Sequence, residues 1–414
     1  MKSVCILVQN YYEMDIRVRR KAEALVAAGF GVDVLALASS YSEAKNYTLN
    51  GVNVHTLALG KKRRSLARYA FEYVAFFLWA FFKLIVLTGQ KRYSIIEANT
   101  LPDFLVFAAA YAKLRGAKVL LDMHEITPEF YVSKYKIKED SVLVWLLKFI
   151  EKASFNFADH VLTINEPIQK LLESRGLPAS KTTVIMNAVD ESLFAGAAGA
   201  SVAADNRTAQ GMFTMMYHGT LTHIYGVDIA IEAFGMARNE MPGAELWILG
   251  NGPEKETLEN LARKLGLDGK VKFIGNVPPE EVPQWLKCCD AGVLATRRDV
   301  FLDYSFSNKL SECIVMGKSV IVSRLKTIRH YFSEEAFAFF EPNDPSDLAR
   351  RMVRLYENPV LRRQLAEQAR LEYAPIRWEV MKGRYLACVD QLVGSRHDVK
   401  PESAAAVSSA ARSQ

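Results

Sequence analysis

The sequence has 414 residues, of which 50% are hydrophobic and 24% charged, and its formal net charge is +6. A chain of this length holds two to three globular domains, since single hydrophobic cores stop growing near about 250 to 300 residues. The apolar content excludes an intrinsically disordered chain, and 23 glycines with 14 prolines exclude a collagen-like one. Because the small basic excess is dispersed along the sequence, nucleic acid is not expected as a partner.

The five cysteines predict neither a disulfide framework nor a metal site. Their number is odd, Cys288 and Cys289 are adjacent, and no C-x-x-C spacing occurs. Isolated cysteines in apolar runs are typical of buried reduced thiols, which indicates a cytoplasmic protein. The first apolar run, 4–8, is too short for the core of a secretory signal and fits a buried strand better.

Short apolar runs alternate with helical patterns, which is typical of parallel sheets with crossover helices. In the first half, the runs expected to form strands are 4–8, 32–37, 94–97, 118–122, 160–163 and 183–186. A helix is expected at 17–28, where apolar residues recur at helical spacing and Gly29 provides a stop.

The stretch 69–88 raises the question of a membrane. It is rich in Phe, Leu, Val and Trp but carries Glu72 and Lys83, and basic residues stand on both sides, at 61–64 and 91–92. A spanning helix needs about 20 largely uncharged residues. The pattern favours a helix that lies in the membrane interface against anionic lipid. Two alternatives stay open: a core helix of the first domain and a true span.

Residues 195–211 are small and polar without periodicity, as in a linker. The strands expected beyond them are 213–218, 245–249, 271–274, 291–295, 319–323 and 336–340. The helices expected between these strands are 226–238, 253–265 and 308–316.

These elements predict two doubly wound α/β domains, at 1–200 and 211–375, with the cleft between them as the default binding site. A last helix is expected at 376–394. The Ser/Ala-rich end, 395–414, is expected to be a disordered tail.

Several familiar nucleotide and metal motifs are incomplete. After Gly250 and Gly252, the third glycine of G-x-G-x-x-G would fall on Lys255. The sequence contains no Asp-x-Asp pair and no H-E-x-x-H. A diphosphate held by a metal ion is therefore not expected.

Two helix starts in the second half suit a phosphate group. The strand 213–218 leads through Gly219 to one of them, and Ser307-Asn308-Lys309-Leu310 opens the other. Backbone amides and the positive end of a helix can hold a diphosphate, with Lys309 adding charge. Glu312, one turn further, is placed to accept hydrogen bonds from ribose hydroxyls. Ordinary βα turns would give the same pattern, and this alternative stays open.

At this point the sequence resembles a known family. The strings YHGTLTHIYGVDIAIEAF, LWILGNGPE, VKFIGNVPPEEVPQWLKCCDAGV and FSNKLSECIVMGKSVI are similar to the second domain of the retaining two-domain glycosyltransferases of family 4, the group 1 superfamily. The strings DIRVRRKAEALVAAGFGVDVLAL, LLDMHEITPEFY and ADHVLTINEP are similar to the first domain. The resemblance covers nearly all of 1–393 and implies the GT-B fold, in which two Rossmann-like domains face a central cleft.

The resemblance implies a sugar-nucleotide donor held mainly by the second domain, an acceptor held by the first, and transfer with retention, without a metal or other cofactor. By motif position, Glu312 is similar to the glutamate that holds the ribose, and Gly219 to the turn beneath the diphosphate. Asn276 and Val277 are similar to the segment at the base. The other donor-side candidates are Thr220, Asn251, Arg297, Ser307, Asn308 and Leu310.

The catalytic candidates are His124 and Lys309. His124 is similar to the family's histidine that approaches the donor sugar from the first domain, and a structural histidine is the alternative. Charge stabilisation of the leaving diphosphate would be the main catalytic contribution.

The departures from the family pattern matter as well. Thr220 and Tyr225 stand where the family has Arg and Lys, and Tyr304 stands at the first glutamate of E-x7-E. Lys309, with Arg297 and Arg298, could replace the missing cations, although these two arginines could equally form a solvated turn. The glycine-rich loop after the first strand is absent too. This leaves Asp15, Arg19 and Glu125 as the acceptor-side candidates.

The expected function is that of a cytoplasmic enzyme at the inner face of the plasma membrane. It would use a nucleotide-sugar to extend a lipid-linked or other glycan acceptor in lipopolysaccharide or exopolysaccharide synthesis, and an anionic membrane surface would be its second partner. Two rival functions stay open: a sugar-nucleotide epimerase of the same architecture, and a non-catalytic sugar-nucleotide-binding subunit.

Overall fold

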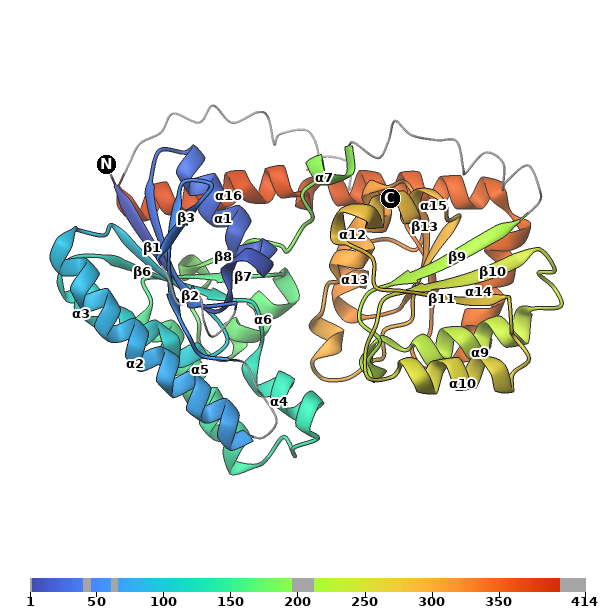
Figure 1. The fold of residues 1–414 in the computed structure, drawn as a ribbon, viewed down its shortest axis with the longest axis horizontal. Helices are drawn as coiled ribbons and strands as arrows, with labels where there is room; N and C mark the ends of the chain where they lie inside the picture. Colours follow the sequence, from blue (N-terminus) through green and yellow to red (C-terminus); the bar gives the residue numbers. More distant parts are fainter. Residues whose placement is uncertain (1, 40–45, 61–65, 196–211, 395–414) are drawn as a thin grey trace.

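The computed structural model describes residues 2–39, 46–60, 66–195 and 212–394. They form two α/β domains, each built on its own sheet (Figure 1). This is the doubly wound two-domain architecture that the sequence predicts. The expected linker between the domains and the expected tail at 395–414 lie outside the described residues, apart from Ala195.

The first domain contains an eight-stranded sheet with the order β3-β4-β2-β1-β5-β6-β7-β8. Its strands are β1 (Ser3–Tyr11), β2 (Gly31–Leu37), β3 (Tyr47–Leu49), β4 (Val52–Leu57), β5 (Ile95–Asn99), β6 (Lys118–Met123), β7 (His160–Thr163) and β8 (Thr182–Val184). The strand order reverses between β1 and β5, and doubly wound sheets bind ligands at the carboxyl ends of the strands beside such a switch point.

The edge strand β3 and its neighbour β4 are a difference from the sequence prediction. They pair antiparallel, whereas the other pairs in this sheet are parallel. In β4, Val52 and Val54 are buried and Asn53 between them is exposed. Strands buried on both faces contain continuous apolar runs, so a search for such runs does not find a strand with alternating burial such as β4.

The second domain contains a six-stranded parallel sheet with the order β11-β10-β9-β12-β13-β14. Its strands are β9 (Phe213–His218), β10 (Ala244–Leu249), β11 (Val271–Gly275), β12 (Ala291–Leu294), β13 (Ser319–Ser323) and β14 (Ala338–Phe340). The switch point lies between β9 and β12. The turns that follow these two strands are therefore at the edge where such sheets bind ligands.

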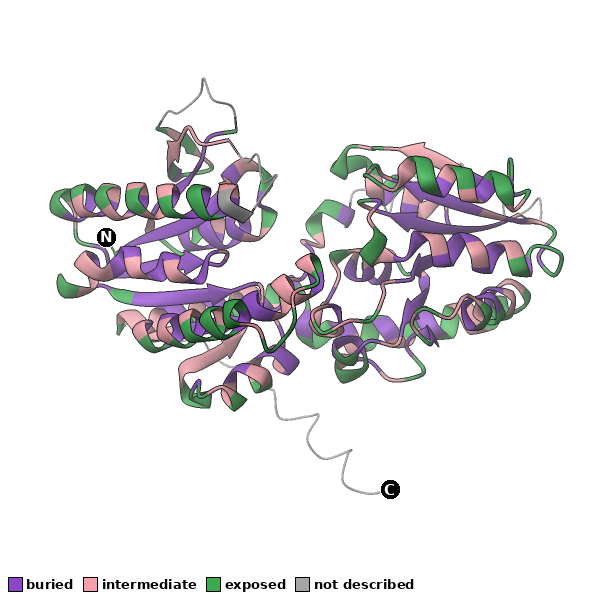
Figure 2. Ribbon diagram, turned by 90° about the horizontal axis from the view of Figure 1, so that it is seen from below, coloured by how far each residue is buried: buried purple, intermediate pink, exposed green. Residues whose placement is uncertain are grey.

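Helices pack on both sheets. In the first half they are α1 (Ile16–Ala27), α2 (Leu66–Gln90), α3 (Ala110–Leu114), α4 (Thr127–Tyr135), α5 (Val142–Phe157), α6 (Glu166–Ser174) and α7 (Ser192–Ala195). In the second half they are α9 (Val227–Ala237), α10 (Lys255–Lys264), α11 (Val282–Lys287), α12 (Asn308–Val315), α13 (Lys326–Tyr331), α14 (Pro345–Glu357), α15 (Pro359–Tyr373) and α16 (Trp378–Val393). Figure 2 shows buried strands in each domain and helices that are exposed along their outer sides.

The first sheet separates two cores. Val4 and Ile6 of β1 belong to the core that also contains residues of α1 and α16. Cys5 and Leu7 alternate with them and belong to a core shared with α2, α5 and the 3-10 segment η2 (Asp103–Ala109). Because successive strand residues point to opposite faces, α2, η2 and α5 all cover the same face of the sheet.

Helix α16 follows the second domain in sequence but packs against the first. Tyr385 Oη donates a hydrogen bond to Glu97 Oε2 of β5 at 2.6 Å. At the start of the helix, the guanidinium of Arg20 in α1 lies 4.5 Å from the ring centroid of Trp378. Helix α16 therefore ties the two domains together.

Helix α2 has two different sides. By length and composition alone it could cross a membrane. However, Phe76, Ala80, Leu84 and Leu87 recur at helical spacing and are buried in the core of the first domain. On the other side, Phe82 is 62% exposed. Helix α2 is thus a core helix along one side, and its outer side is apolar and unburied.

Candidate active site

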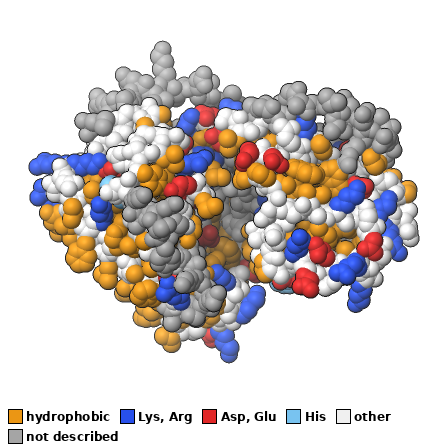
Figure 3. Space-filling model, viewed as in Figure 1, with side chains coloured by type: hydrophobic (Ala, Val, Ile, Leu, Met, Phe, Trp, Pro, Cys, Tyr) orange, Lys and Arg blue, Asp and Glu red, His pale blue; other side chains and the backbone are white. Residues whose placement is uncertain are grey.

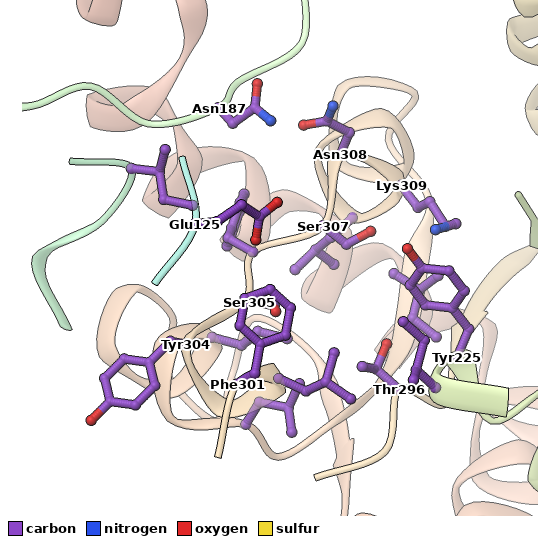
Figure 4. A pocket seen from close by; sticks show the side chains of 18 of the residues that line it. Glu125, Asn187, Tyr225, Thr296, Phe301, Tyr304, Ser305, Ser307, Asn308 and Lys309 are labelled. Carbon is purple, nitrogen blue, oxygen red and sulfur yellow. The ribbon is translucent and has the colours of Figure 1, made fainter. Parts of the chain in front are cut away.

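A cavity of about 330 Å³ lies between the two domains, beside the carboxyl ends of strands from both sheets. The first domain contributes Arg17 of α1 and His124 and Glu125, which follow β6. The second contributes the loop after β12 and the start of α12, and Figure 4 shows these side chains surrounding the space. Six of the predicted site residues line this cavity, namely His124, Glu125, Ser307, Asn308, Lys309 and Leu310.

Two glycines allow the backbone after β9 to pack closely against Lys309. Gly219 follows β9 with φ +127°, and Gly250 follows the neighbouring strand β10 with φ +135°. A Cβ atom at Gly250 would overlap the carbonyl of Gly219, and one at Gly219 would overlap Cε of Lys309. Only glycine combines these φ angles with this lack of space. The turn after β9 therefore lies directly against Lys309.

The start of α12 provides backbone donors. Ser307 precedes the helix, and its side chain makes no capping hydrogen bond. The first amides of an α-helix have no partner inside the helix and carry partial positive charge. Since Ser307 and Asn308 line the cavity, this positive helix end opens toward it (Figure 4). Such an arrangement suits a phosphate group.

Lys309 adds a full charge beside these amides. Its Nζ lies 3.8 Å from the ring centroid of Tyr225 and 5.9 Å from that of Tyr217. Burial lowers the pKa of Lys309 to about 8, although Glu312 acts in the opposite direction. Lys309 therefore stays mostly protonated at neutral pH. Tyr225, at a position where the family has a cation, instead contacts this cation through its ring.

Glu312 lies one turn further along α12. His218, the last residue of β9, lies with Nε2 2.6 Å from Glu312 Oε2. The Glu312 side chain is 22% exposed, but it does not line the 330 Å³ cavity. A role in ribose binding stays a prediction. His218 directly precedes Gly219 in the sequence but was not among the predicted site residues.

One ring nitrogen of His124 lies within hydrogen-bond distance of two side-chain oxygen atoms. Its Nε2 lies 3.0 Å from Asp122 Oδ2 and 3.1 Å from Asn99 Oδ1. Since both neighbours accept hydrogen bonds, we assign the proton to Nε2. Burial lowers the pKa of His124, and Arg17 and Lys21 lower it further, whereas Asp122 raises it. A neutral ring with the proton on Nε2 leaves Nδ1 as an acceptor.

Beneath His124 lies a buried group of charges that the sequence analysis missed. Lys21 of α1 is ion-paired with Asp122 and with Glu97, whose Oε1 is 2.5 Å from Lys21 Nζ. Burial alone would lower the pKa of Lys21, but these two carboxylates raise it. Tyr385 of α16 completes the group through Glu97. A chain of polar contacts thus connects α16 with His124.

A smaller cavity of about 180 Å³ adjoins the first one, and Arg17 and Glu125 line both. Arg17 donates to both carboxyl oxygens of Asp15, at 3.2 Å each. Although burial raises it, the pKa of Asp15 is lowered to about 2 by Arg17 and by a hydrogen bond from Asn10. Burial raises the pKa of Glu125 to about 7, against the effect of Arg17.

Arg19 lies on another side of α1. It donates to the carbonyl of Glu13 and pairs with Glu23, and it lines neither cavity. Arg17, which the sequence analysis did not single out, takes the place expected for Arg19. The available signal was spacing: Arg17 and Lys21 are four residues apart and so share a helix face.

The other donor-side candidates lie outside the 330 Å³ cavity. Thr220, Asn251 and Asn276 are exposed on the second domain, and Val277 packs partly against its core. Arg297 pairs with Asp228 and donates to the carbonyl of His223 at 3.0 Å, so it stabilises its own domain. Their parts in donor binding stay predictions.

Two family models match the chain. Residues 14–188 match the glycosyl transferase 4-like domain, and residues 203–372 match the glycosyl transferases group 1 domain. The chain belongs to the group 1 glycosyltransferase family. The expected family and its GT-B fold are confirmed.

Curated relatives of this glycosyltransferase are distant. It is 24% identical over 272 residues to one component of phosphatidylinositol N-acetylglucosaminyltransferase from Arabidopsis thaliana. The matched segment covers 65% of this chain and 53% of the relative. It is 27% identical over 155 residues to the lipopolysaccharide core biosynthesis glycosyltransferase LpsE from Rhizobium meliloti, covering 37% of this chain and 42% of the relative. The chain thus matches about half the length of these two relatives.

Solved structures share the fold along nearly the whole glycosyltransferase. Sucrose-phosphate synthase from Thermosynechococcus elongatus superposes with a TM-score of 0.72 at 19% identity, covering 95% of this chain and all of the other. HepE from Anabaena, solved in complex with UDP, superposes with a TM-score of 0.68 at 16% identity, covering 94% of this chain and all of the other.

Proposed function

We propose that this glycosyltransferase binds a nucleoside diphosphate sugar in the cavity between its domains, with the diphosphate at the start of α12. The observation that carries the proposal is that the start of α12 and Lys309 form one wall of that cavity, with the turn at Gly219 packed directly against Lys309. His124 and Glu125 face this wall from the first domain. The binding of UDP by the structurally similar HepE supports a uridine nucleotide as the first donor to test.

The proposed reaction retains the anomeric configuration. The acceptor oxygen forms a bond to the anomeric carbon while the bond from that carbon to the diphosphate breaks, and the acceptor proton passes to the leaving phosphate oxygen on the same face. Among the described residues that line the cavity, Glu125 is the one carboxylate, and burial raises its pKa to about 7, so that it is partly protonated at neutral pH. Lys309 and the α12 amides would stabilise the developing charge of the diphosphate. Independence from metal ions is part of the proposal.

The proposed acceptor is a lipid-linked glycan in cell-surface polysaccharide synthesis, bound in the 180 Å³ cavity. Tyr73 of α2 lines that cavity together with Arg17 and Glu125, so an acceptor there would lie beside the apolar helix. The lipopolysaccharide and phosphatidylinositol named in the two relatives support such an acceptor. We place the enzyme in the cytoplasm, against the inner face of the plasma membrane.

A donor screen tests the proposal. The purified protein is incubated with UDP, GDP and ADP sugars, with thermal shift and hydrolysis as readouts, beside Glu312→Ala and Lys309→Ala. We expect one nucleotide class to raise the melting temperature of the wild type more than that of the variants and to be slowly hydrolysed. A free epimerised sugar would instead favour an epimerase. Binding without turnover, across a panel of glycan acceptors, would favour a non-catalytic binding protein.

A further inference from the structure

Helices α2 and α5 carry a large share of the exposed apolar side chains. Among the described residues, nineteen large hydrophobic side chains are exposed, and ten of these belong to the two helices. Phe71 and Phe82 of α2 are 55% and 62% exposed, and Trp145 and Phe149 of α5 are 65% and 59% exposed. Soluble proteins rarely expose such side chains in groups unless the group has a binding role.

These residues lie on one side of the first domain. Helices α2 and α5 cover the same face of the sheet, and η2 lies between them: Phe104 contacts Phe77 of α2, and Phe107 of η2 contacts Phe157 of α5. The outer sides of both helices therefore face away from the sheet in the same general direction. In Figure 3, hydrophobic side chains gather along the lower-left margin of the first domain, where Figure 1 places α2.

The charges on the two helices are arranged unevenly. Each helix contains a single acidic residue, and each of these is buried and ion-paired: Glu72 with Arg68 of the same helix, and Glu151 with Arg175. The remaining charged residues are Lys83 on α2 and Lys148 and Lys152 on α5, all of them basic. Lys148 and Lys152 are exposed. The outer sides of the helices thus combine apolar side chains with positive charge only.

We propose that α2 and α5 together form a docking surface for an anionic lipid bilayer, with Trp145 and Phe149 of α5 entering the interface beside Phe71 and Phe82 of α2. This inference rests on the membrane location proposed above and assigns α5, which the sequence analysis did not single out, as the second half of the surface. Apolar side chains supply the buried area, and the lysines supply attraction to anionic headgroups.

The buried side of α2 favours a helix that lies on the bilayer over one that crosses it. A span would remove Phe76, Ala80 and Leu84 from the core that they share with β1 and β5. It would also take Glu72, which is 1% exposed, out of the domain core and bring it into contact with lipid. The acidic residues Glu139 and Asp140 precede α5, but Lys136 and Lys138 stand beside them and balance their charge.

Flotation with vesicles tests the surface. One set of vesicles contains phosphatidylcholine with phosphatidylglycerol, and the other contains phosphatidylcholine alone. We expect the full-length protein to float with the anionic set, and the pairs Trp145→Glu with Phe149→Glu and Leu78→Glu with Phe82→Glu each to weaken this binding by about tenfold or more. Replacing Lys148 and Lys152 by Gln should weaken it roughly fivefold per lysine on anionic vesicles only.

The matched control is the pair Val360→Glu and Leu371→Glu, which changes two exposed apolar residues of α15 in the second domain and should leave flotation unchanged. Trp145→Phe is a conservative variant that provides a second readout. Adding anionic vesicles should shift the tryptophan fluorescence of the wild type to shorter wavelength. Trp145→Phe should lose part of this shift.

Three results would overturn the inference. The first is wild-type flotation that the α5 pair leaves unaltered. The second is a wild-type protein that does not float. The third is a dimer in sedimentation that the α5 pair dissociates without any effect on flotation, which would make a second copy the occupant of the surface. UDP titration of the same variants separates this question from donor binding, because none of these residues lines the 330 Å³ cavity.

Discussion

The Nζ atom of Lys309 lies 3.8 Å from the centre of the Tyr225 ring, and Gly219 leaves the space that the lysine side chain fills. The usual arginine and lysine of the family are replaced here by Thr220 and Tyr225. In the proposed donor site, Lys309 at the start of α12 would act as the cation in their place. This arrangement and the charges buried beneath His124 lead to specific expectations for binding and stability.

Adding one methyl group at Gly219 should disturb the donor site. The Cβ atom of Gly219→Ala would overlap Cε of Lys309 and displace the ammonium group. We expect the affinity for UDP to fall about tenfold or more, because charge-assisted hydrogen bonds contribute about 1.5 to 3 kcal/mol. Calorimetric titration measures this loss.

Gly269→Ala is the matched control for the backbone strain. Gly269 also has a positive φ, +76°, but a Cβ atom there would meet nothing within 4 Å. Both variants therefore carry the cost of an alanine at positive φ, and only Gly219→Ala moves Lys309. Equal UDP affinity in the two variants would contradict the account.

The affinity for UDP should fall as the pH rises through the pKa of Lys309. Burial lowers this pKa to about 8 in the unliganded protein, and a bound diphosphate would raise it again. The charge that attracts the diphosphate is present below that pH and is lost above it. We expect a tenfold or larger decrease between pH of about 7 and pH of about 10, because a charged donor contributes about 1.5 to 3 kcal/mol. Lys309→Met should bind UDP weakly, and its affinity should depend little on pH. If the variant shows the same pH dependence of UDP affinity as the wild type, the charge of Lys309 does not determine that dependence.

The stability of the protein should depend on pH through Glu125. Its pKa is raised from 4.5 to about 7, so the folded state favours the neutral carboxyl. The stability from this group is present below pH 4.5 and is lost as the pH rises through about 7. Glu125→Gln should have the same free energy of unfolding as the wild type at low pH and exceed it by up to about 3 kcal/mol at pH of about 8. Urea unfolding at several pH values measures the difference, and a constant difference would refute the assignment.

Lys21 should matter more for stability than a surface lysine. Lys21→Met leaves Asp122 and Glu97 buried without their cation, which costs about 3 to 5 kcal/mol. Tyr385→Phe removes one hydrogen bond from the same group and should cost about 1 to 3 kcal/mol. Lys382→Met, on the same helix as Tyr385, removes a surface pair with Glu379 and should cost less than about 1 kcal/mol. Urea unfolding gives the order, and similar costs for Lys21→Met and Lys382→Met would contradict it.

The sequence predicts the fold well where strands are buried on both faces. The run 4–8 lies within β1 and 319–323 coincides with β13. The alternating strand β4 contains no such apolar run and was therefore not predicted. Helix α5 (Val142–Phe157) was not predicted either. Its first half is apolar at most positions, so the sequence shows no clear helical periodicity there.

The sequence predicts the part of the site that is formed by residues adjacent in the chain. Ser307, Asn308 and Lys309 are consecutive, and the start of a helix brings their groups together without help from elsewhere. Contacts between residues that are far apart in the sequence cannot be predicted in the same way. Lys21 and Asp122 meet only because α1 packs beside β6, and no local pattern reports that contact.

The most direct test of the donor site is a calorimetric titration of UDP into the wild type, Lys309→Met and Lys326→Met. Lys326 is a lysine of the same domain that donates to Tyr304 Oη at 3.0 Å and does not line the 330 Å³ cavity. We predict that Lys309→Met weakens UDP binding by tenfold to a hundredfold, because a charged hydrogen bond contributes about 1.5 to 3 kcal/mol, and that Lys326→Met binds like the wild type. If Lys309→Met binds UDP as tightly as the wild type, Lys309 is not the cation that replaces the family's arginine and lysine.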